Sequence, residues 1–119
     1  MAFNDYLKQI YEKVDGSVAC GVAGFDGLTV ESYPKGQKGP NMESVTAELS
    51  MKIKELFGSF SGAGLGRPEE LMLKSKESTI LVRTLTNEYF LMLILDSQKA
   101  IGMGRYYLRV IGPLLLNEL

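Results

Sequence analysis

The 119-residue sequence contains no histidine, no tryptophan and a single cysteine, Cys20. Without histidine there is no Ser-His-Asp or Cys-His nucleophilic site, no imidazole metal ligand and no side chain that ordinarily titrates near neutral pH. One cysteine cannot form an intramolecular disulfide or a cysteine-based metal site. We expect Cys20 to be a small buried apolar residue. We therefore expect neither a metal nor a cofactor.

The sequence also lacks an excess of charge of one sign and a long hydrophobic run. It has 13 basic and 14 acidic side chains, a formal net charge of -1, and no basic cluster of the kind that nucleic-acid binding requires. Its longest apolar stretches, 89–95 and 110–116, are much shorter than the roughly 20 residues of a membrane-spanning helix. We expect a cytoplasmic protein with no nucleic-acid partner and no membrane span. With 45% hydrophobic residues, the apolar share is generous for a small monomer.

Hydrophobic periodicity and turn signals predict a single α+β domain over 1–119. An Asp26-Gly27 pair between two extended runs indicates a tight hairpin with a type I′ turn, and the segment 34–40 reads as a flexible loop. Asn41 is placed to cap the second helix, and Asp96-Ser97 to cap the last one. The predicted order is a helix over 3–14, strands over 18–25 and 28–33, a helix over 42–60, strands over 71–74, 79–85 and 89–95, and a helix to the C-terminus.

The long second helix is predicted to have two unlike faces. The apolar stripe expected to pack on the sheet is Val45, Leu49, Ile53, Leu56, Phe57 and Phe60. The opposite face carries Glu43, Ala47, Met51, Lys54 and Gly58. Small residues and an exposed methionine favour close approach by another helix or protein, although single exposed apolar residues are also normal.

The last helix is predicted to have two apolar faces. One consists of Ile101, Leu108, Ile111 and Leu115, and the other of Met103, Tyr106, Val110 and Leu114. One face can pack on the sheet, whereas the other needs cover from the first helix or from a second subunit. Gly102 and Gly104 lower the helix propensity of this segment, so we expect another element to pack closely against the helix at these positions.

Each group of residues that could be catalytic is explained better by a structural role. The acidic residues Glu69, Glu70, Glu77, Glu88 and Asp96 lie at predicted strand ends and turns, where solvated carboxylates are common. Ser50 and Lys54 lie one turn apart, which permits a Ser-Lys pair but more simply describes two surface residues. We expect the protein not to be an enzyme.

The glycine-rich segment 61–66 follows a helix and precedes a strand, and no Lys-Ser/Thr pair closes it. Phosphate-binding loops have the opposite order, so we favour a helix cap and flexible connector. Arg67, beside this segment, could be delivered to a GTPase from a mobile loop, but we favour a plain linker residue before Pro68.

The order of elements resembles the roadblock family, also called the dynein light-chain roadblock or longin-like family, and especially its bacterial MglB-type members. The resemblance covers nearly the whole chain. It rests on 18–32 with the Asp26-Gly27 turn, on Thr46-Ala47, and on Leu95-Asp96-Ser97 followed by Gly102 and Arg105.

The resemblance implies a five-stranded antiparallel sheet with the second helix on one face and the first and last helices on the other. It also implies an obligate homodimer or heterodimer in which the third strands pair and the second helices lie side by side, and we expect a homodimer. The resemblance further implies a platform for a small Ras-like, MglA-type GTPase, which either stimulates GTP hydrolysis as a GTPase-activating protein or stabilises the active form, without supplying an arginine finger. The residues we expect at the partner or dimer interface are Ala47, Ser50, Met51, Lys54, Gly58, Leu71, Met72 and Leu73.

Three functions remain open from the sequence. The first is a non-catalytic homodimeric regulator that binds a small Ras-like GTPase through the second helices. The second is a scaffold subunit of a larger assembly that docks through the second apolar face of the last helix. The third is a small-molecule sensor with a ligand held between the sheet and the helices.

Overall fold

A computed structural model of the chain describes residues 2–35, 41–96 and 99–119. The predicted loop over 34–40 lies mostly outside these residues. Within them, the elements follow the predicted order closely. They are α1 (Ala2–Lys13), β1 (Ser17–Gly24), β2 (Thr29–Tyr33), α2 (Met42–Phe60), the π-helical turn η1 (Ser61–Leu65), β3 (Glu70–Lys74), β4 (Thr79–Thr84), β5 (Tyr89–Leu95) and α3 (Ile101–Leu116).

The five strands form one antiparallel sheet in the order β2-β1-β5-β4-β3. β5 lies at the centre and is buried from Phe90 to Leu95, which explains why its sequence is apolar on both faces. The edges of the sheet are β2 and β3. The predicted α+β fold with a five-stranded antiparallel sheet is therefore confirmed.

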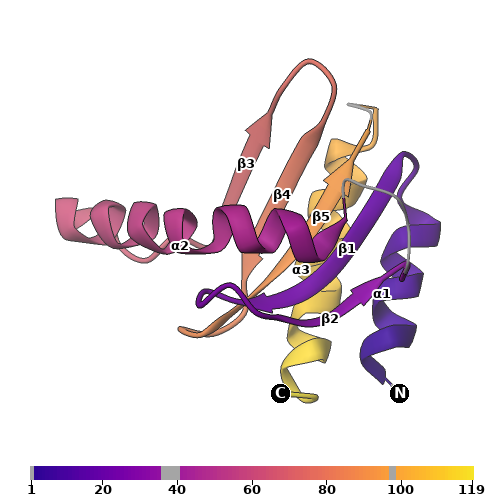
Figure 1. The fold of residues 1–119 in the computed structure, drawn as a ribbon, viewed down its shortest axis with the longest axis horizontal. Helices are drawn as coiled ribbons and strands as arrows, with labels where there is room; N and C mark the ends of the chain where they lie inside the picture. Colours follow the sequence, from indigo (N-terminus) through magenta and orange to yellow (C-terminus); the bar gives the residue numbers. More distant parts are fainter. Residues whose placement is uncertain (1, 36–40, 97–98) are drawn as a thin grey trace.

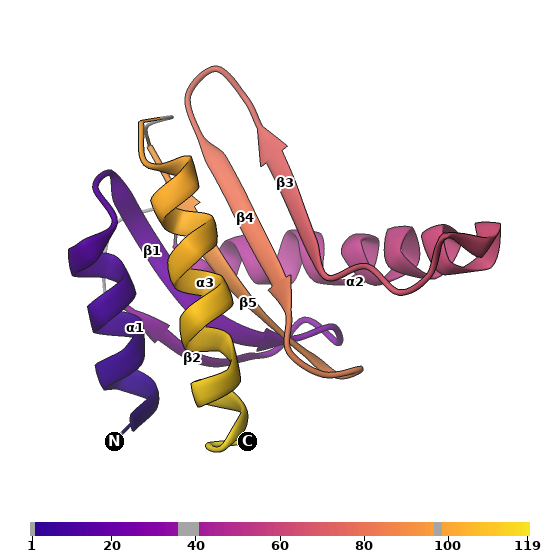
Figure 2. The ribbon, with the colours of Figure 1, turned by 180° about the vertical axis from the view of Figure 1, so that it is seen from behind.

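Helices cover both faces of the sheet. α2 crosses one face, whereas α1 and α3 lie side by side on the other (Figures 1 and 2). Alternate residues of the central strands supply two separate cores. Under α1 and α3 the core includes Leu7, Ile10, Cys20, Leu91, Leu93, Leu108 and Ile111. Under α2 it includes Ala19, Phe25, Met42, Ile53, Phe90, Met92 and Ile94.

The β1–β2 hairpin forms where Asp26-Gly27 predicts it, but its turn differs from the expected type. A type I′ turn needs a positive φ at both central residues. Among the described residues only glycines have a positive φ, so Asp26 does not, whereas Gly27 has a φ of 97°. The N–H of Gly24 donates to Leu28 O and the N–H of Gly27 donates to Gly24 O. These bonds enclose a three-residue loop that ends in a left-handed glycine, the next most common hairpin connection.

The start of the last helix also differs from expectation. α3 begins at Ile101 with Ala100 at the N-cap, where no side chain caps the helix. The prediction that Asp96-Ser97 caps this helix is therefore wrong, and Ser97 itself lies outside the described residues. Gly104 has the expected packing role, because a Cβ there would lie 2.7 Å from Leu81 Cδ1, whereas a Cβ on Gly102 would meet nothing within 4 Å.

The predicted stripe of α2 is only partly confirmed. Val45, Leu49, Ile53 and Phe57 pack on the core under the helix. Met42, Thr46 and Ser50, which the stripe does not include, are buried beside them. Leu56 and Phe60, predicted as core, are 51% and 43% exposed. Two hydroxyl residues, Thr46 and Ser50, thus occupy positions that hydrophobicity alone would assign elsewhere.

Candidate interaction surface

The exposed apolar side chains of α2 gather where this helix runs past the sheet. Figures 1 and 2 both show α2 and the turn after it extending beyond β3, so that the C-terminal part of the helix has no strand beneath it. From the middle of α2 to the end of η1, the exposed large apolar side chains are Met51, Leu56, Phe60 and Leu65. The overhang accounts for the exposure of Leu56 and Phe60, whereas Ile53 and Phe57 of the same stripe pack on the core.

Hydrogen bonds fix the start of α2 and the turn that follows its end. Asn41 caps α2, since its side-chain Oδ1 accepts the N–H of Ser44 at 3.0 Å, as predicted. At the other end, Ser61 Oγ donates to Gly66 O at 2.9 Å, and Gly64 adopts φ 84° inside the turn η1. The glycine-rich segment therefore continues α2 as a π-helical turn, whereas the sequence indicated a flexible connector.

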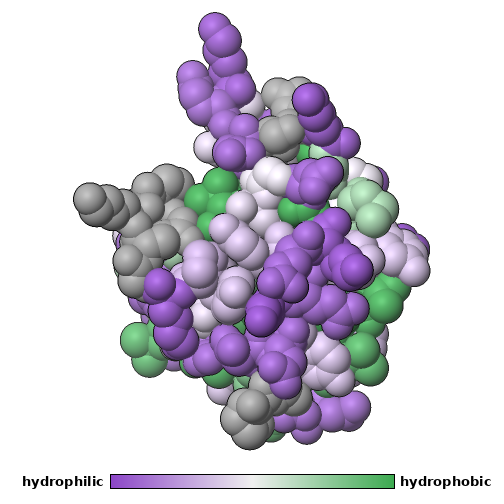
Figure 3. Space-filling view, turned by 90° about the vertical axis from the view of Figure 1, so that its right-hand side faces the viewer, coloured by the Kyte–Doolittle hydropathy of each residue, from purple (hydrophilic) through white to green (hydrophobic). Residues whose placement is uncertain are grey.

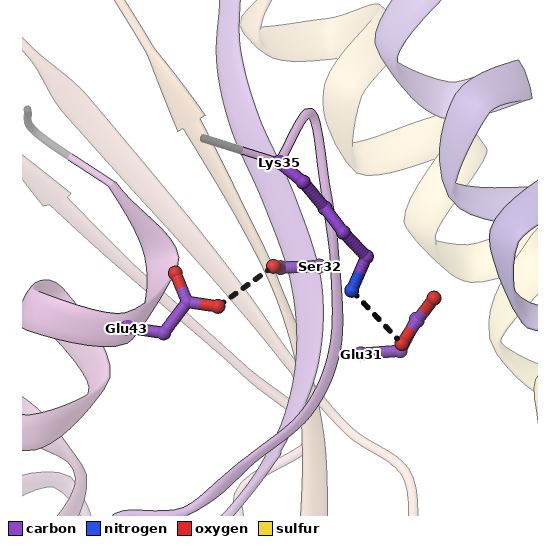
Figure 4. Close-up of polar contacts among 4 residues, drawn as sticks. All are labelled: Glu31, Ser32, Lys35 and Glu43. Atoms are coloured by element: carbon purple, nitrogen blue, oxygen red, sulfur yellow. Dashed lines mark hydrogen bonds and ion pairs between the residues drawn. The ribbon is translucent and has the colours of Figure 1, made fainter. Parts of the chain in front are cut away.

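The first turn of α2 is also tied to the edge strand β2. Figure 4 shows Ser32 Oγ donating to Glu43 Oε2 at 3.0 Å, while Lys35 pairs with Glu31 at 3.3 Å on the other side of the strand. Glu43 lies in the first helical turn, where a negative charge also interacts favourably with the helix dipole. The N-terminal part of α2 is thus held over β2, and the free part lies at the β3 end.

The edge strand β3 is a second feature of this surface. One side pairs with β4, and among the described strands none pairs with the other side. Met72 and Leu73 are 48% and 45% exposed. An exposed edge with apolar side chains is a ready site for pairing with another strand. On the α3 face, Glu70 accepts two hydrogen bonds from Arg105, which hold the pKa of the Glu70 carboxyl below its usual range.

The opposite end of the molecule is different in character. Figure 3 views the end at which α1 and β2 lie, and hydrophilic residues occupy most of the visible middle, with apolar patches towards the margins. In the described part of the chain, no helix combines the length and apolar character that crossing a membrane requires.

Most of the predicted interface residues are accessible, with one clear exception. Ala47, Met51, Lys54 and Gly58 are exposed on α2, as are Met72 and Leu73 on β3, whereas Leu71 is half-buried and packs towards α2. Ser50 is fully buried against the sheet and cannot form part of a surface. Sequence reasoning missed Leu56, Phe60 and Leu65 as surface residues, because a helical stripe does not reveal where the sheet beneath it ends.

The possible catalytic groups stay apart. Ser50 is buried while Lys54, one turn later, is exposed, and the two form no hydrogen bond. Among the described residues, no three histidine, cysteine, aspartate or glutamate side chains lie close enough together to hold a metal ion. Burial raises the pKa of the Cys20 thiol to about 12, and Cys20 Sγ donates to Leu7 O. Cys20 is therefore a core residue, as predicted.

Comparison with known proteins gives a consistent picture at the level of structure. No family model matches the sequence, and no curated protein matches it. Among solved structures, the chain is similar to MglC from Myxococcus xanthus, with 29% identity, full coverage of both chains and a TM-score of 0.71. It is also similar to Myxococcus xanthus MglB, with 12% identity over 99% of this chain and 94% of that chain, at a TM-score of 0.85.

A third similar structure is a Roadblock/LC7 domain from Streptomyces avermitilis, with 11% identity over 95% of this chain and 93% of that chain, at a TM-score of 0.74. TM-scores of 0.71 to 0.85 over nearly the whole chain show that the fold is shared. The chain therefore has the fold of the roadblock/MglB-type family, which confirms the resemblance found in its sequence.

Proposed function

We propose that the protein is a non-catalytic homodimeric regulator that binds a small Ras-like GTPase of the MglA type and modulates its GTP hydrolysis or its active state. The observation that carries the proposal is the overhang of α2 beside the open edge of β3. Leu56, Phe60 and Leu73 are exposed there, each by 43–51%. Pairing of two β3 edges would bring each overhang above the partner's sheet and cover these side chains.

The GTPase surface proposed here is the outer face of the paired α2 helices, with Ala47 and Met51 at its centre. Ala47 is small and exposed, and Met51 is 68% exposed. A flexible thioether next to a small residue suits an adaptable protein contact. Because the described residues hold no group placed for phosphoryl transfer, modulation would act through the position of the GTPase's own active site.

The dimer is tested by measuring the mass of the protein with light scattering over a hundredfold dilution. We expect a dimer for the native chain and a monomer for Leu73→Lys, because a lysine on an edge strand disfavours edge pairing. Val110→Lys, at an exposed apolar position on α3, serves as the control and should remain dimeric. A monomeric native chain, or equal dimerisation of both variants, would show that the dimer assignment is wrong.

The GTPase surface is tested separately by titrating an MglA-type GTPase, loaded with a GTP analogue or with GDP, against dimeric protein. Ala47→Arg should weaken binding, whereas Gln9→Arg on α1 should leave it unchanged. No binding by the native dimer would refute the function itself. Equal binding by both variants would refute only the assignment of the surface.

A second candidate function, a scaffold subunit of a larger assembly, is favoured by the exposed stripe on α3. Met103, Tyr106, Val110 and Leu114 are 40–47% exposed, although α1 lies beside this helix. The two candidates differ in a simple measurement, because a dimer that shows no further association on concentration would speak against the scaffold role of this stripe.

A further inference from the structure

A hollow opens beside the C-terminal part of α2, between the helix and the turns that join β1 to β2 and β4 to β5. Its volume is about 300 Å³, at the lower end of the range for small-molecule sites. The lining residues are Phe25, Lys54, Phe57, Gly58, Ser61, Arg67, Pro68, Thr84 and Asn87. Its helical residues Lys54, Gly58 and Ser61 lie on the flank of α2 opposite Leu56 and Phe60, so the proposed dimer does not need this hollow.

Hydrogen bonds hold the outer wall of the hollow in place. Thr84 Oγ1 donates to Pro68 O at 3.1 Å, and the N–H of Thr84 donates to Glu69 O at 3.0 Å. Ser61 Oγ donates to Gly66 O on the other side of Arg67. The backbone of Arg67 is thus anchored before and after the residue, which is the opposite of an arginine on a mobile loop.

Three of the polar side chains that line the hollow have hydrogen-bond donors without partners. Within the described ranges, the side chains of Lys54, Arg67 and Asn87 make no hydrogen bond or ion pair with another residue. No carboxylate lines the hollow, so its two positive charges are not balanced locally. Charge-assisted donors that line one hollow, with no counter-charge in its lining, favour an anion.

Carboxylates border the hollow on two sides and limit where an anion can bind. Asp26 and Glu88 line an adjoining hollow that also includes Lys54 and Asn87. Glu69 and Glu70 line another that includes Arg67 and Pro68, and Glu70 already pairs with Arg105. An anion is therefore favoured between Lys54 and Arg67, and disfavoured beyond either residue.

The apolar part of the lining consists largely of aromatic rings. Phe25 and Phe57 pack edge to face with ring centroids 5.9 Å apart, and Phe25 also contacts Phe90 at 5.0 Å. Pro68 closes the same side of the hollow. A flat apolar group can pack against this surface, since rings contact one another favourably by stacking or edge to face.

From these contacts, we propose that the hollow is a binding site for a small organic anion with a flat apolar body and one acidic group, a carboxylate or a phosphate ester. Lys54 and Arg67 bind the acidic group, Asn87 donates a further hydrogen bond, and Phe25, Phe57 and Pro68 contact the apolar body. Lys54 and Gly58 also belong to the predicted contact face of α2, so a bound ligand would border that face.

The site is tested by calorimetric titration of the full chain with 2-naphthoate, 1-naphthyl phosphate, neutral 2-naphthamide and inorganic phosphate. We expect both aromatic anions to bind. The neutral amide and inorganic phosphate should bind at least about tenfold more weakly, because the amide lacks the acidic group and inorganic phosphate lacks the apolar body. Arg67→Gln and Lys54→Gln should each weaken the binding of 2-naphthoate by about tenfold, the value of one charge-assisted hydrogen bond.

Arg109→Gln is the matched control, because it removes one positive charge from α3 on the opposite face of the sheet. It should leave the affinity for 2-naphthoate unchanged. The proposal would be overturned by equal binding of 2-naphthamide, by unchanged affinity in Arg67→Gln and Lys54→Gln, or by an equal loss in Arg109→Gln. Absence of binding by either aromatic anion at millimolar concentration would also overturn it. None of these outcomes bears on dimer formation, which is measured by mass.

Discussion

Arg105 on α3 and Glu70 on β3 form a two-point ion pair, with Nε–Oε1 and Nη2–Oε2 distances of 2.9 Å each. The two residues are 35 positions apart in the chain, and their contact ties the edge strand of the sheet to the last helix. Because β3 pairs with a neighbouring strand on one side only, this contact adds a second attachment for it.

Removal of the ion pair should have a pH-dependent effect on stability. The pKa of Glu70 is lowered in the folded state, mainly by the hydrogen bonds from Arg105. The ionised carboxylate therefore contributes fully to the free energy of unfolding above the ordinary carboxyl pKa. This contribution is lost as the pH falls through the folded-state pKa. Glu70→Gln should therefore have a slightly lower melting temperature than the native chain at pH 7, and the difference should vanish in acid. The effect is small because both side chains are substantially exposed.

The measurement is thermal unfolding of both proteins from pH 7 to pH 2, at low and high salt. Glu69→Gln is the matched control, since Glu69 is an adjacent exposed carboxylate without an ion pair to any described residue. A difference between Glu70→Gln and the native chain that persists unchanged in acid would contradict the assigned role of the pair.

Gly21→Ala should destabilise the fold by about 1–3 kcal/mol, the usual cost of overpacking. A Cβ at this position in β1 would lie 2.7 Å from the backbone carbonyl oxygen of Glu31 and 3.0 Å from Met42 Cε. The strand β2 or the helix α2 would have to shift. Gly102→Ala, where a Cβ meets nothing, should instead stabilise the protein by up to about 1 kcal/mol. Urea unfolding of both variants measures these two changes in stability. A destabilised Gly102→Ala would contradict the prediction.

Thr46→Val should stabilise the protein by about 1 kcal/mol. Thr46 is fully buried on the side of α2 that faces the sheet, and its Oγ1 has no hydrogen-bond partner among the described residues. Valine keeps the branched shape and removes the unsatisfied hydroxyl. Thr86→Val is the opposite case, because Thr86 Oγ1 accepts the N–H groups of Glu88 and Tyr89 at 3.0 Å each, and its loss should destabilise the β4–β5 turn. Denaturant unfolding measures both changes in the free energy of unfolding. If the two variants change it in the same direction, this explanation is wrong.

Cys20 should react with a thiol reagent only when the protein unfolds. Its side chain is fully buried, and burial raises its pKa to about 12, so at pH 8 the thiolate that reacts is nearly absent. Labelling of the native protein at pH 8 should therefore follow the rate of unfolding and become rapid in denaturant. A cysteine introduced by Lys8→Cys at an exposed position of α1 should react at once without denaturant. Rapid labelling of Cys20 in the native protein would contradict its place in the core.

The candidate surface was only partly predictable from the sequence. Ala47 and Met51 could be found because helical periodicity places them opposite the apolar stripe, and both are exposed. Leu56 and Phe60 could not be found, since the same periodicity assigns them to the core. Their exposure follows from the length of α2 relative to the sheet beneath it, and that relation depends on the strand order.

Local sequence patterns were enough to predict the order of the elements and most of their bounds, because periodicity, caps and turns act over a few residues. Asn41 and the apolar run of β5 are examples. Tertiary contacts were needed to establish which strands form the sheet edges, which part of α2 lies beyond the sheet, and how Arg67 and Lys54 come to line one hollow. These properties arise from contacts between residues far apart in the chain, and no local pattern encodes such contacts. The scarcity of catalytic residue types is visible in the sequence, whereas the overhang of α2 that suggests a partner surface is visible only in the fold.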